Sequence, residues 1–157
     1  MWPFPGAGYG YYLPLKEILT GEVKIKGHIC RFKDGYIYCD GTVIQGLRIS
    51  EGYAFIAAVH YTSWENATQI RSMRRIEPSL NDPFVYLTPP GTMQDWTEET
   101  IRKEIGANAA NTDVKIRLSM PVERVWIKFT RSKIVHFAIS SLVDEHMITD
   151  LEIQKHS

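Results

Sequence analysis

The sequence predicts one α+β domain built mostly from short β-strands, and three observations favour this class. The chain has 157 residues, which is close to the length of a single domain. Short apolar or alternating runs recur along it, and Gly, Pro and Asp residues separate them as in turns. Only two segments have helical spacing, and both are short. The sequence contains no repeat, heptad pattern or low-complexity tract.

The overall charge and hydrophobicity bear on two kinds of partner, nucleic acids and membranes. The formal net charge is zero, so no global field attracts nucleic acid or an anionic membrane. A local phosphate-binding patch remains open, although a solvated face is the more ordinary interpretation; its members would be Arg71, Arg74, Arg75, Arg131 and Lys133. No apolar run approaches the roughly 20 residues of a membrane span. The N-terminus lacks the features of a signal peptide, so export would need another route or a larger precursor.

The N-terminal third divides into two parts. Residues 1–14 are rich in Gly, Pro and aromatic side chains and are interpreted as a linker. Residues 15–49 form an accessory hairpin block ahead of the core. Its strands are predicted at Val23–Phe32, Tyr36–Cys39 and Val43–Ile49, with turns at Asp34-Gly35 and Asp40-Gly41.

The first of these turns also predicts a register. A type I′ turn at Asp34-Gly35 places Cys30 opposite Cys39, at a position without ladder hydrogen bonds between the two residues. A disulfide is sterically allowed there. Two reduced, partly buried cysteines are the simpler interpretation, and the spacing of neither cysteine is that of a metal site.

The core is predicted to begin at a buried strand, Tyr53–His60. Thr62-Ser-Trp-Glu65 fits a capping box, so a helix should follow and run to about Arg74, with Pro78-Ser79 as its end. A strand at Phe84–Thr88, a turn at Pro89-Pro90-Gly91 and a second helix at Thr97–Ile105 come next. The remaining strands are expected at Val114–Leu118, Val122–Phe129, Ile134–Ile139 and roughly His146–Ile153.

The order strand, helix, loop, strand over residues 59–88 resembles the start of ADP-ribosyltransferase toxin domains that use a His-Tyr-Asp/Glu triad. The segments that carry the resemblance are Val59-His-Tyr-Thr-Ser63 and Phe84-Val-Tyr-Leu-Thr88. The resemblance covers about residues 54–153 and implies an ADP-ribosyltransferase-like split β-sandwich. The domain would then span residues 15–157, with residues 15–49 as an N-terminal extension that matches no part of the family.

The resemblance also implies site residues. His60 would hydrogen-bond NAD, and the backbone of Tyr61, with Thr62 beside it, would hold the nicotinamide amide. Tyr86 would lie against the nicotinamide ring, and Ser79 would contact the cofactor. The ordinary alternative is that these are a strand-end histidine, an amphipathic strand tyrosine and a turn serine.

The catalytic acid is expected near the C-terminus, at the entry to a late strand. Glu145 fits best, and Asp144, Asp150 and Glu152 remain alternatives. Arginine-specific relatives carry an acid or amide two residues before the catalytic Glu, and Val143 occupies that position here. Glu152 as the acid would instead give an Asp150-x-Glu152 arrangement.

The function implied is NAD-dependent transfer of ADP-ribose, with release of nicotinamide, to a protein or RNA acceptor. NAD is then a substrate, and neither a metal nor a membrane is involved. The resemblance further implies the toxin domain of a secreted bacterial effector, which acts in the cytoplasm of a target cell and is neutralised by a cognate immunity protein. Two alternatives remain: an enzyme similar to RNA 2′-phosphotransferases, and a non-catalytic α+β binding module.

Overall fold

The computed structural model describes residues 11–25, 27–77, 84–90, 114–129, 135–139 and 143–153. Several predicted features lie outside these ranges: the helix at Thr97–Ile105, Pro78, Ser79, Arg131 and Lys133. The described elements are mostly antiparallel strands with few short helices, which confirms an α+β fold. None of the described helices is long and apolar enough to cross a membrane.

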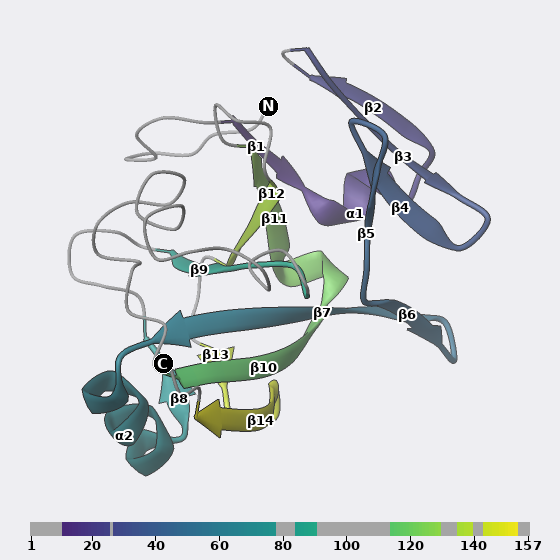
Figure 1. Cartoon of the computed structure of the whole chain (residues 1–157). Coiled ribbons are helices and arrows are strands. Elements are labelled where there is room, and N and C mark those ends of the chain that lie inside the picture. The colour runs from purple at the N-terminus through teal and green to yellow at the C-terminus, as the bar shows by residue number, and fades with distance from the viewer. Residues whose placement is uncertain are drawn as a thin grey trace.

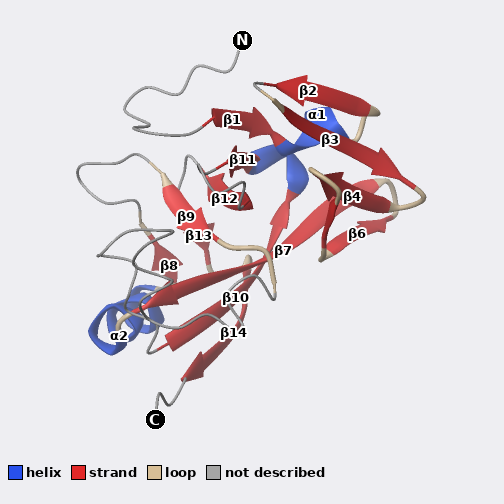
Figure 2. Ribbon diagram, turned by 45° about the horizontal axis from the view of Figure 1, so that its top comes forward, coloured by secondary structure: helices blue, strands red, loops and turns tan. Residues whose placement is uncertain are grey.

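Two four-stranded antiparallel sheets form the core (Figures 1 and 2). The first sheet has the order β1 (Tyr11–Pro14), β11 (Val125–Phe129), β12 (Val135–Ile139) and β9 (Val85–Leu87). The second has the order β14 (Ile148–Ile153), β10 (Val114–Pro121), β7 (Tyr53–Thr62) and β6 (Leu47–Ser50). A short 3-10 helix, η2 (Val122–Arg124), separates β10 from β11, so the predicted strand Val122–Phe129 begins three residues late.

The buried faces of both sheets share one hydrophobic core. From the first sheet the register row Leu13, Ile127, Phe137 and Leu87 faces inward. From the second sheet the inward residues include Ile56, Ala58, Ile116 and Leu118. Because side chains alternate along a strand, the neighbours of these residues in sequence face the other side of each sheet.

The N-terminal residues belong to the fold rather than to a linker alone. Tyr11–Pro14 forms β1, which pairs with β11, and α1 (Leu15–Ile18) follows it directly. The last four residues of the predicted linker are therefore strand.

The accessory block is a third antiparallel sheet, β2 (Glu22–Ile25), β3 (His28–Lys33), β4 (Tyr36–Cys39) and β5 (Thr42–Ile44). Its register confirms the predicted pairing of Cys30 with Cys39, and both are free and buried in the shared core. A hydrogen bond with Cys30, together with burial, raises the pKa of Cys39, so Cys39 stays a thiol at neutral pH.

Two of the predicted strands in this block are each split by a glycine. Val23–Phe32 turns at Gly27, where φ is +84°, so that Ile25 pairs with His28. Val43–Ile49 breaks at Gly46, with φ of +101°. A Cβ at Gly46 would lie 2.9 Å from the Ala57 Cβ, so a side chain there is excluded by packing as well as by φ. Beyond Gly46 the chain enters the core sheet as β6.

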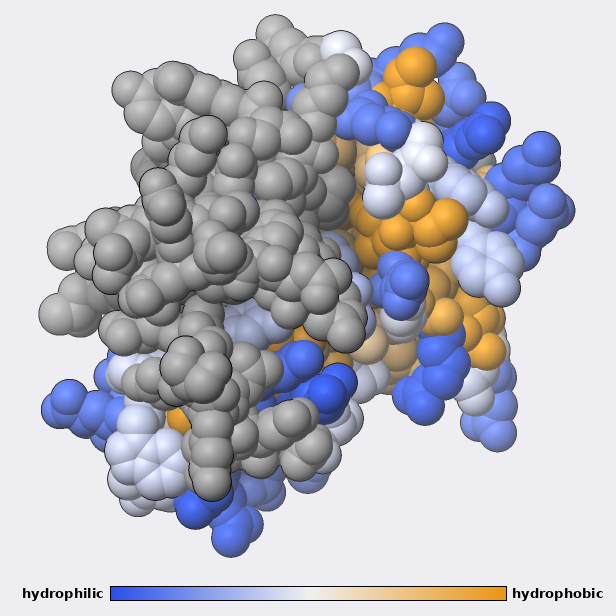
Figure 3. All heavy atoms as spheres, in the orientation of Figure 1, coloured by the Kyte–Doolittle hydropathy of each residue, from blue (hydrophilic) through white to orange (hydrophobic). Residues whose placement is uncertain are grey.

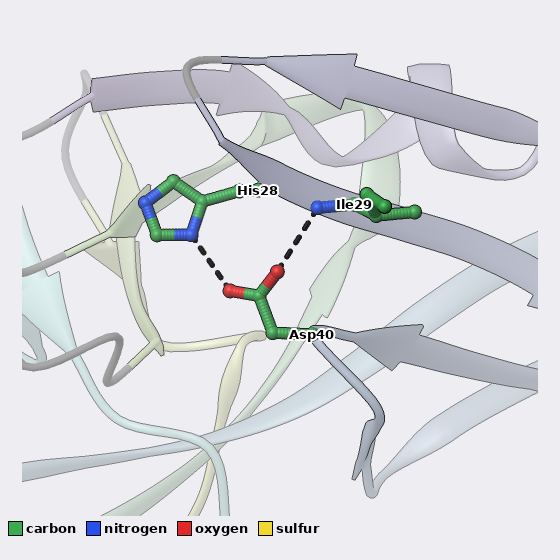
Figure 4. A network of polar contacts seen from close by, with 3 residues as sticks. All are labelled: His28, Ile29 and Asp40. Carbon is green, nitrogen blue, oxygen red and sulfur yellow. Dashed lines mark hydrogen bonds and ion pairs between the residues drawn. The ribbon is translucent and has the colours of Figure 1, made fainter.

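A polar network inside the accessory sheet holds the His28 ring (Figure 4), and this ring also contacts the core. His28 Nδ1 lies 2.6 Å from Asp40 Oδ2, and the Ile29 amide donates to Asp40 Oδ1 at 3.0 Å. The His28 ring stacks on Phe129 of β11, with ring centroids 4.2 Å apart. On the face drawn in Figure 3, apolar surface remains visible beside the accessory sheet and β6. The exposed large hydrophobic side chains of this region are Ile29, Tyr36, Val43 and Ile49.

Helix α2 (Trp64–Met73) follows β7, and its start differs from the prediction by one residue. Ser63, and not Thr62, is the N-cap, because its hydroxyl accepts from the Asn66 amide at 3.1 Å. The helix ends at Arg74, which is left-handed with φ of +56°, and this confirms the predicted end at about Arg74. The chain then forms β8 (Arg75–Ile76), which pairs with β13 (Val143–Asp144).

Candidate functional site

The two core sheets meet where β7 touches β9, and the candidate site lies at this junction. Among the described residues, β7 and β9 share one bridge, Val59 with Thr88. Both backbone hydrogen bonds of the pair are 2.8 Å long, and the Thr88 hydroxyl adds a contact of 3.3 Å to the Val59 carbonyl. This is a hydrogen-bonded antiparallel pair.

His60 contacts β9 directly after this bridge. In a regular ladder, the next hydrogen-bonded pair would join Tyr61 to Tyr86, with the Tyr61 amide donating to the Tyr86 carbonyl. Here His60 Nδ1 lies 3.0 Å from that carbonyl oxygen. A side-chain donor therefore lies at the Tyr86 carbonyl, directly beyond the bridge that joins the two sheets.

This geometry fixes the chemistry of the imidazole. Burial lowers the pKa of His60, and the hydrogen bond to the Tyr86 carbonyl opposes that shift only in part. The ring is therefore neutral at pH 7. Because a carbonyl oxygen only accepts, Nδ1 carries the proton and donates it. The other nitrogen, Nε2, then has a lone pair that can accept a hydrogen bond from a hydroxyl group.

Tyr61 and Tyr86 share one face beside the bridge. The bridge puts Val59 and Thr88 on the same face, and alternation extends that face to Tyr61 on β7 and Tyr86 on β9. The same alternation directs the backbone groups of Tyr61 toward β9. His60 thus contacts the backbone of Tyr86, whereas the phenol of Tyr86 lies on the Tyr61 face.

The ring of Tyr86 belongs to a small aromatic cluster outside the main core. Phe84 lies 6.5 Å from it between ring centroids, and Ala138 and Trp126 complete the cluster. The ammonium of Lys128 sits over the ring, 4.8 Å from its centroid. The sequence reasoning did not identify Trp126 or Lys128. The alternation of Val125–Phe129 does place both opposite the buried face, but the pairing that brings them to Tyr86 has no local signal.

Glu145 lies elsewhere in the contact network. It occupies the turn between β13 and β14, and its Oε2 lies 3.3 Å from Arg74 Nη1 at the end of α2. The side chain is 47% exposed. The structure therefore joins the His60 imidazole to the main chain of Tyr86 and pairs Glu145 with Arg74.

The alternative acids occupy different backbone positions. Asp144 lies in β13, and its Oδ1 accepts from the His146 amide at 3.0 Å. In the second core sheet, the register row of His60 runs through Ile116 to Leu151. Asp150 and Glu152 occupy the neighbouring rows, those of Val59 and Tyr61.

Two more residues, Thr62 and Ser79, were predicted to bind the cofactor. Thr62 is buried at the end of β7 opposite Val114, so its place is structural as well as next to the site. Ser79 lies outside the described residues. Within the described part of the chain, no three His, Cys, Asp or Glu residues gather as metal ligands would.

Comparison with known proteins gives no relative: no family model matches this chain, and neither a curated protein nor a solved structure is significantly similar to it.

Proposed function

We propose that this domain is an NAD-dependent ADP-ribosyltransferase. The observation that carries the proposal is the junction of β7 and β9, where His60 is held by the Tyr86 carbonyl. The neutral imidazole of His60, the backbone of Tyr61 and the main chain of Tyr86 are then close together where the two sheets meet, and the Tyr86 ring lies on the other face of its strand. These are the groups that the resemblance assigns to the dinucleotide.

The chemistry asks for positioning more than for a strong base. The bond between nicotinamide and its ribose breaks through an oxocarbenium-like transition state, so the enzyme must orient the dinucleotide and stabilise positive charge. In this proposal His60 Nε2 accepts from a ribose hydroxyl and the Tyr61 backbone binds the nicotinamide amide. The Tyr86 ring forms a wall for nicotinamide, and the Glu145 carboxylate stabilises the developing cation.

The ion pair of Glu145 is compatible with this role. Its partner Arg74 is 74% exposed, and exposed ion pairs contribute only about 0–1 kcal/mol. The carboxylate can therefore exchange Arg74 for a ligand at little cost in free energy.

The biological setting in this proposal comes from the resemblance alone. The acceptor is a protein side chain or a nucleic acid, and the domain is the toxin part of a secreted bacterial effector that acts inside a target cell. A cognate immunity protein would then bind it.

The first experiment incubates the purified chain with NAD and measures free nicotinamide by chromatography. We expect slow release without an acceptor, and label transfer from radiolabelled NAD to a lysate component that is sensitive to protease or nuclease. Activity only with 2′-phosphorylated RNA would favour the phosphotransferase alternative. Absence of NAD binding at millimolar concentration would favour the non-catalytic module.

Two variants of His60 separate its contact with the fold from its contact with NAD. His60→Asn keeps an N–H near the Nδ1 position for the Tyr86 carbonyl but lacks Nε2, whereas His60→Ala loses both. We expect both to fold and both to lose NAD binding and turnover together. If His60→Asn retained full turnover, the role of Nε2 would be refuted; if His60→Ala alone unfolded, the histidine would be structural.

A further inference from the structure

We infer that Lys128 is an anion-binding residue of this site and that it takes the diphosphate of the dinucleotide. The inference rests on the proposed function and adds to it a residue that no resemblance assigns. Lys128 lies in β11, two residues after Trp126 and in register with His136. Its ammonium is 4.8 Å from the centroid of the Tyr86 ring.

The placement of Lys128 follows from the strand. Ile127 and Phe129 are buried in the core, so Lys128 and Trp126 project from the opposite face. The row Trp126, Ala138 and Tyr86 runs across three strands on that face. Lys128 lies beside this row, opposite His136.

The charge of this sheet favours an anion. The four strands β1, β11, β12 and β9 contain no Asp or Glu, and Lys128 is the one Lys or Arg among them. The Lys128 side chain is only partly exposed, and its ammonium lies over the face of the Tyr86 ring. A cation in a partly desolvated position interacts with an anion more strongly than a cation on an open surface.

The same ring connects the two ligand groups. In the proposed function, nicotinamide lies against Tyr86, and the diphosphate follows one ribose away. A flexible lysine side chain anchored over that ring can reach the first or second phosphate. Nicotinamide alone carries no phosphate and provides the internal comparison.

The experiment measures the dissociation constants of NAD, ADP-ribose and nicotinamide for the full chain by calorimetry or ligand-observed NMR. The variants are Lys128→Met, which keeps the chain length without the charge, and Lys128→Arg, which keeps the charge. Lys33→Met in the accessory hairpin is the control, because it makes the same change in net charge at an exposed position.

We expect Lys128→Met to raise the dissociation constants of NAD and ADP-ribose about tenfold or more, since it removes one charge-assisted contact. The dissociation constant of nicotinamide should not change. Lys128→Arg should stay near wild type, and Lys33→Met should match it. Equal losses for all three ligands would mean that Lys128 only supports the Tyr86 ring, and unchanged affinities would remove it from the site; either result overturns the inference.

A wild-type chain that binds neither NAD nor ADP-ribose would instead refute the proposed function. If Lys128→Met did not fold, the salt dependence of the wild type would decide. Affinity for ADP-ribose should then fall between 50 and 500 mM salt while that for nicotinamide does not. No such difference would overturn the inference.

Discussion

Two buried or half-buried histidines, His28 and His60, sit in two regions of opposite character. In the accessory sheet, His28 donates to the Asp40 carboxylate and stacks on Phe129, so its surroundings are closed by protein groups. At the sheet junction, His60 donates to a backbone carbonyl where two strands part. A histidine that lies where two strands stop pairing is a site candidate, whereas a histidine that completes a closed network is a structural residue.

The largest change in stability is expected in the accessory sheet, on substitution of Asp40. Asp40→Ala removes the acceptor of two hydrogen bonds and puts Ala at a φ of +51°, so we expect a loss of about 3 kcal/mol in the free energy of unfolding. Asp40→Asn tolerates the same φ and should cost about 1 kcal/mol. Urea denaturation measures both. NAD turnover per folded molecule should not change; a selective loss of turnover would show that the accessory sheet contributes to the site.

Substitution of Glu145 should have the opposite result, a loss of turnover with little change in stability. Glu145→Gln should leave NAD binding and the unfolding midpoint nearly unchanged and should lower turnover about 100-fold, because the lost interaction belongs to the transition state. Steady-state nicotinamide release measures it. Arg74→Gln is the matched control, since it breaks the same ion pair and leaves the carboxylate in place. If Glu145→Gln kept wild-type turnover, Glu145 would not be the catalytic acid, and Asp144, Asp150 and Glu152 would be the candidates.

The boundary between the two regions gives the next effect. Gly46→Ala meets the Ala57 Cβ and an unfavourable φ, so we expect about 2 kcal/mol of destabilisation. Gly52→Ala has a similar φ of +82° with nothing within 4 Å, and it should cost about 1 kcal/mol. Thermal unfolding measures both variants, and the difference between their losses of stability is the cost of the contact with Ala57. Equal losses would show that β6 moves away from β7 easily.

The smallest effect concerns pH. Because burial lowers the pKa of His60, the unfolded chain binds a proton at this residue before the folded chain does. Stability should therefore fall as the pH drops below about 6.5, the ordinary histidine value. The free energy of unfolding of the wild type relative to His60→Asn should decrease between pH 7.5 and 5. His146→Asn, at an exposed turn position, is the control. A constant difference would contradict the protonation argument.

The sequence predicted local features of the fold well. The Asp34-Gly35 turn was enough for the register of Cys30 with Cys39, because a two-residue turn determines the pairing beyond it. Gly27 and Gly46 were missed as strand ends, since an apolar run on both sides of a glycine is also typical of a continuous strand. The cap was displaced by one residue, because Thr62 and Ser63 are both good caps and tertiary pairing of Thr62 with Val114 decides between them.

The site was predictable only as a set of candidates. The sequence placed His60 at a strand end and Tyr86 in a strand, but not the contact of the imidazole with the Tyr86 carbonyl, which joins positions 26 residues apart. Pairing of Glu145 with Arg74 spans 71 residues and has no local signal either. Strand periodicity reports which face a side chain occupies, whereas which strands meet is a property of the whole chain.

The paired thiols of the accessory hairpin have a consequence for the compartments that the chain can occupy. Cα atoms at such an antiparallel position are about 4.5 Å apart, within the span that a disulfide bridges, so oxidation needs no rearrangement of the main chain. A bond would enclose only residues 31–38, a loop that the hairpin already closes. The same backbone therefore suits oxidising and reducing surroundings alike, and passage from one to the other need not involve refolding.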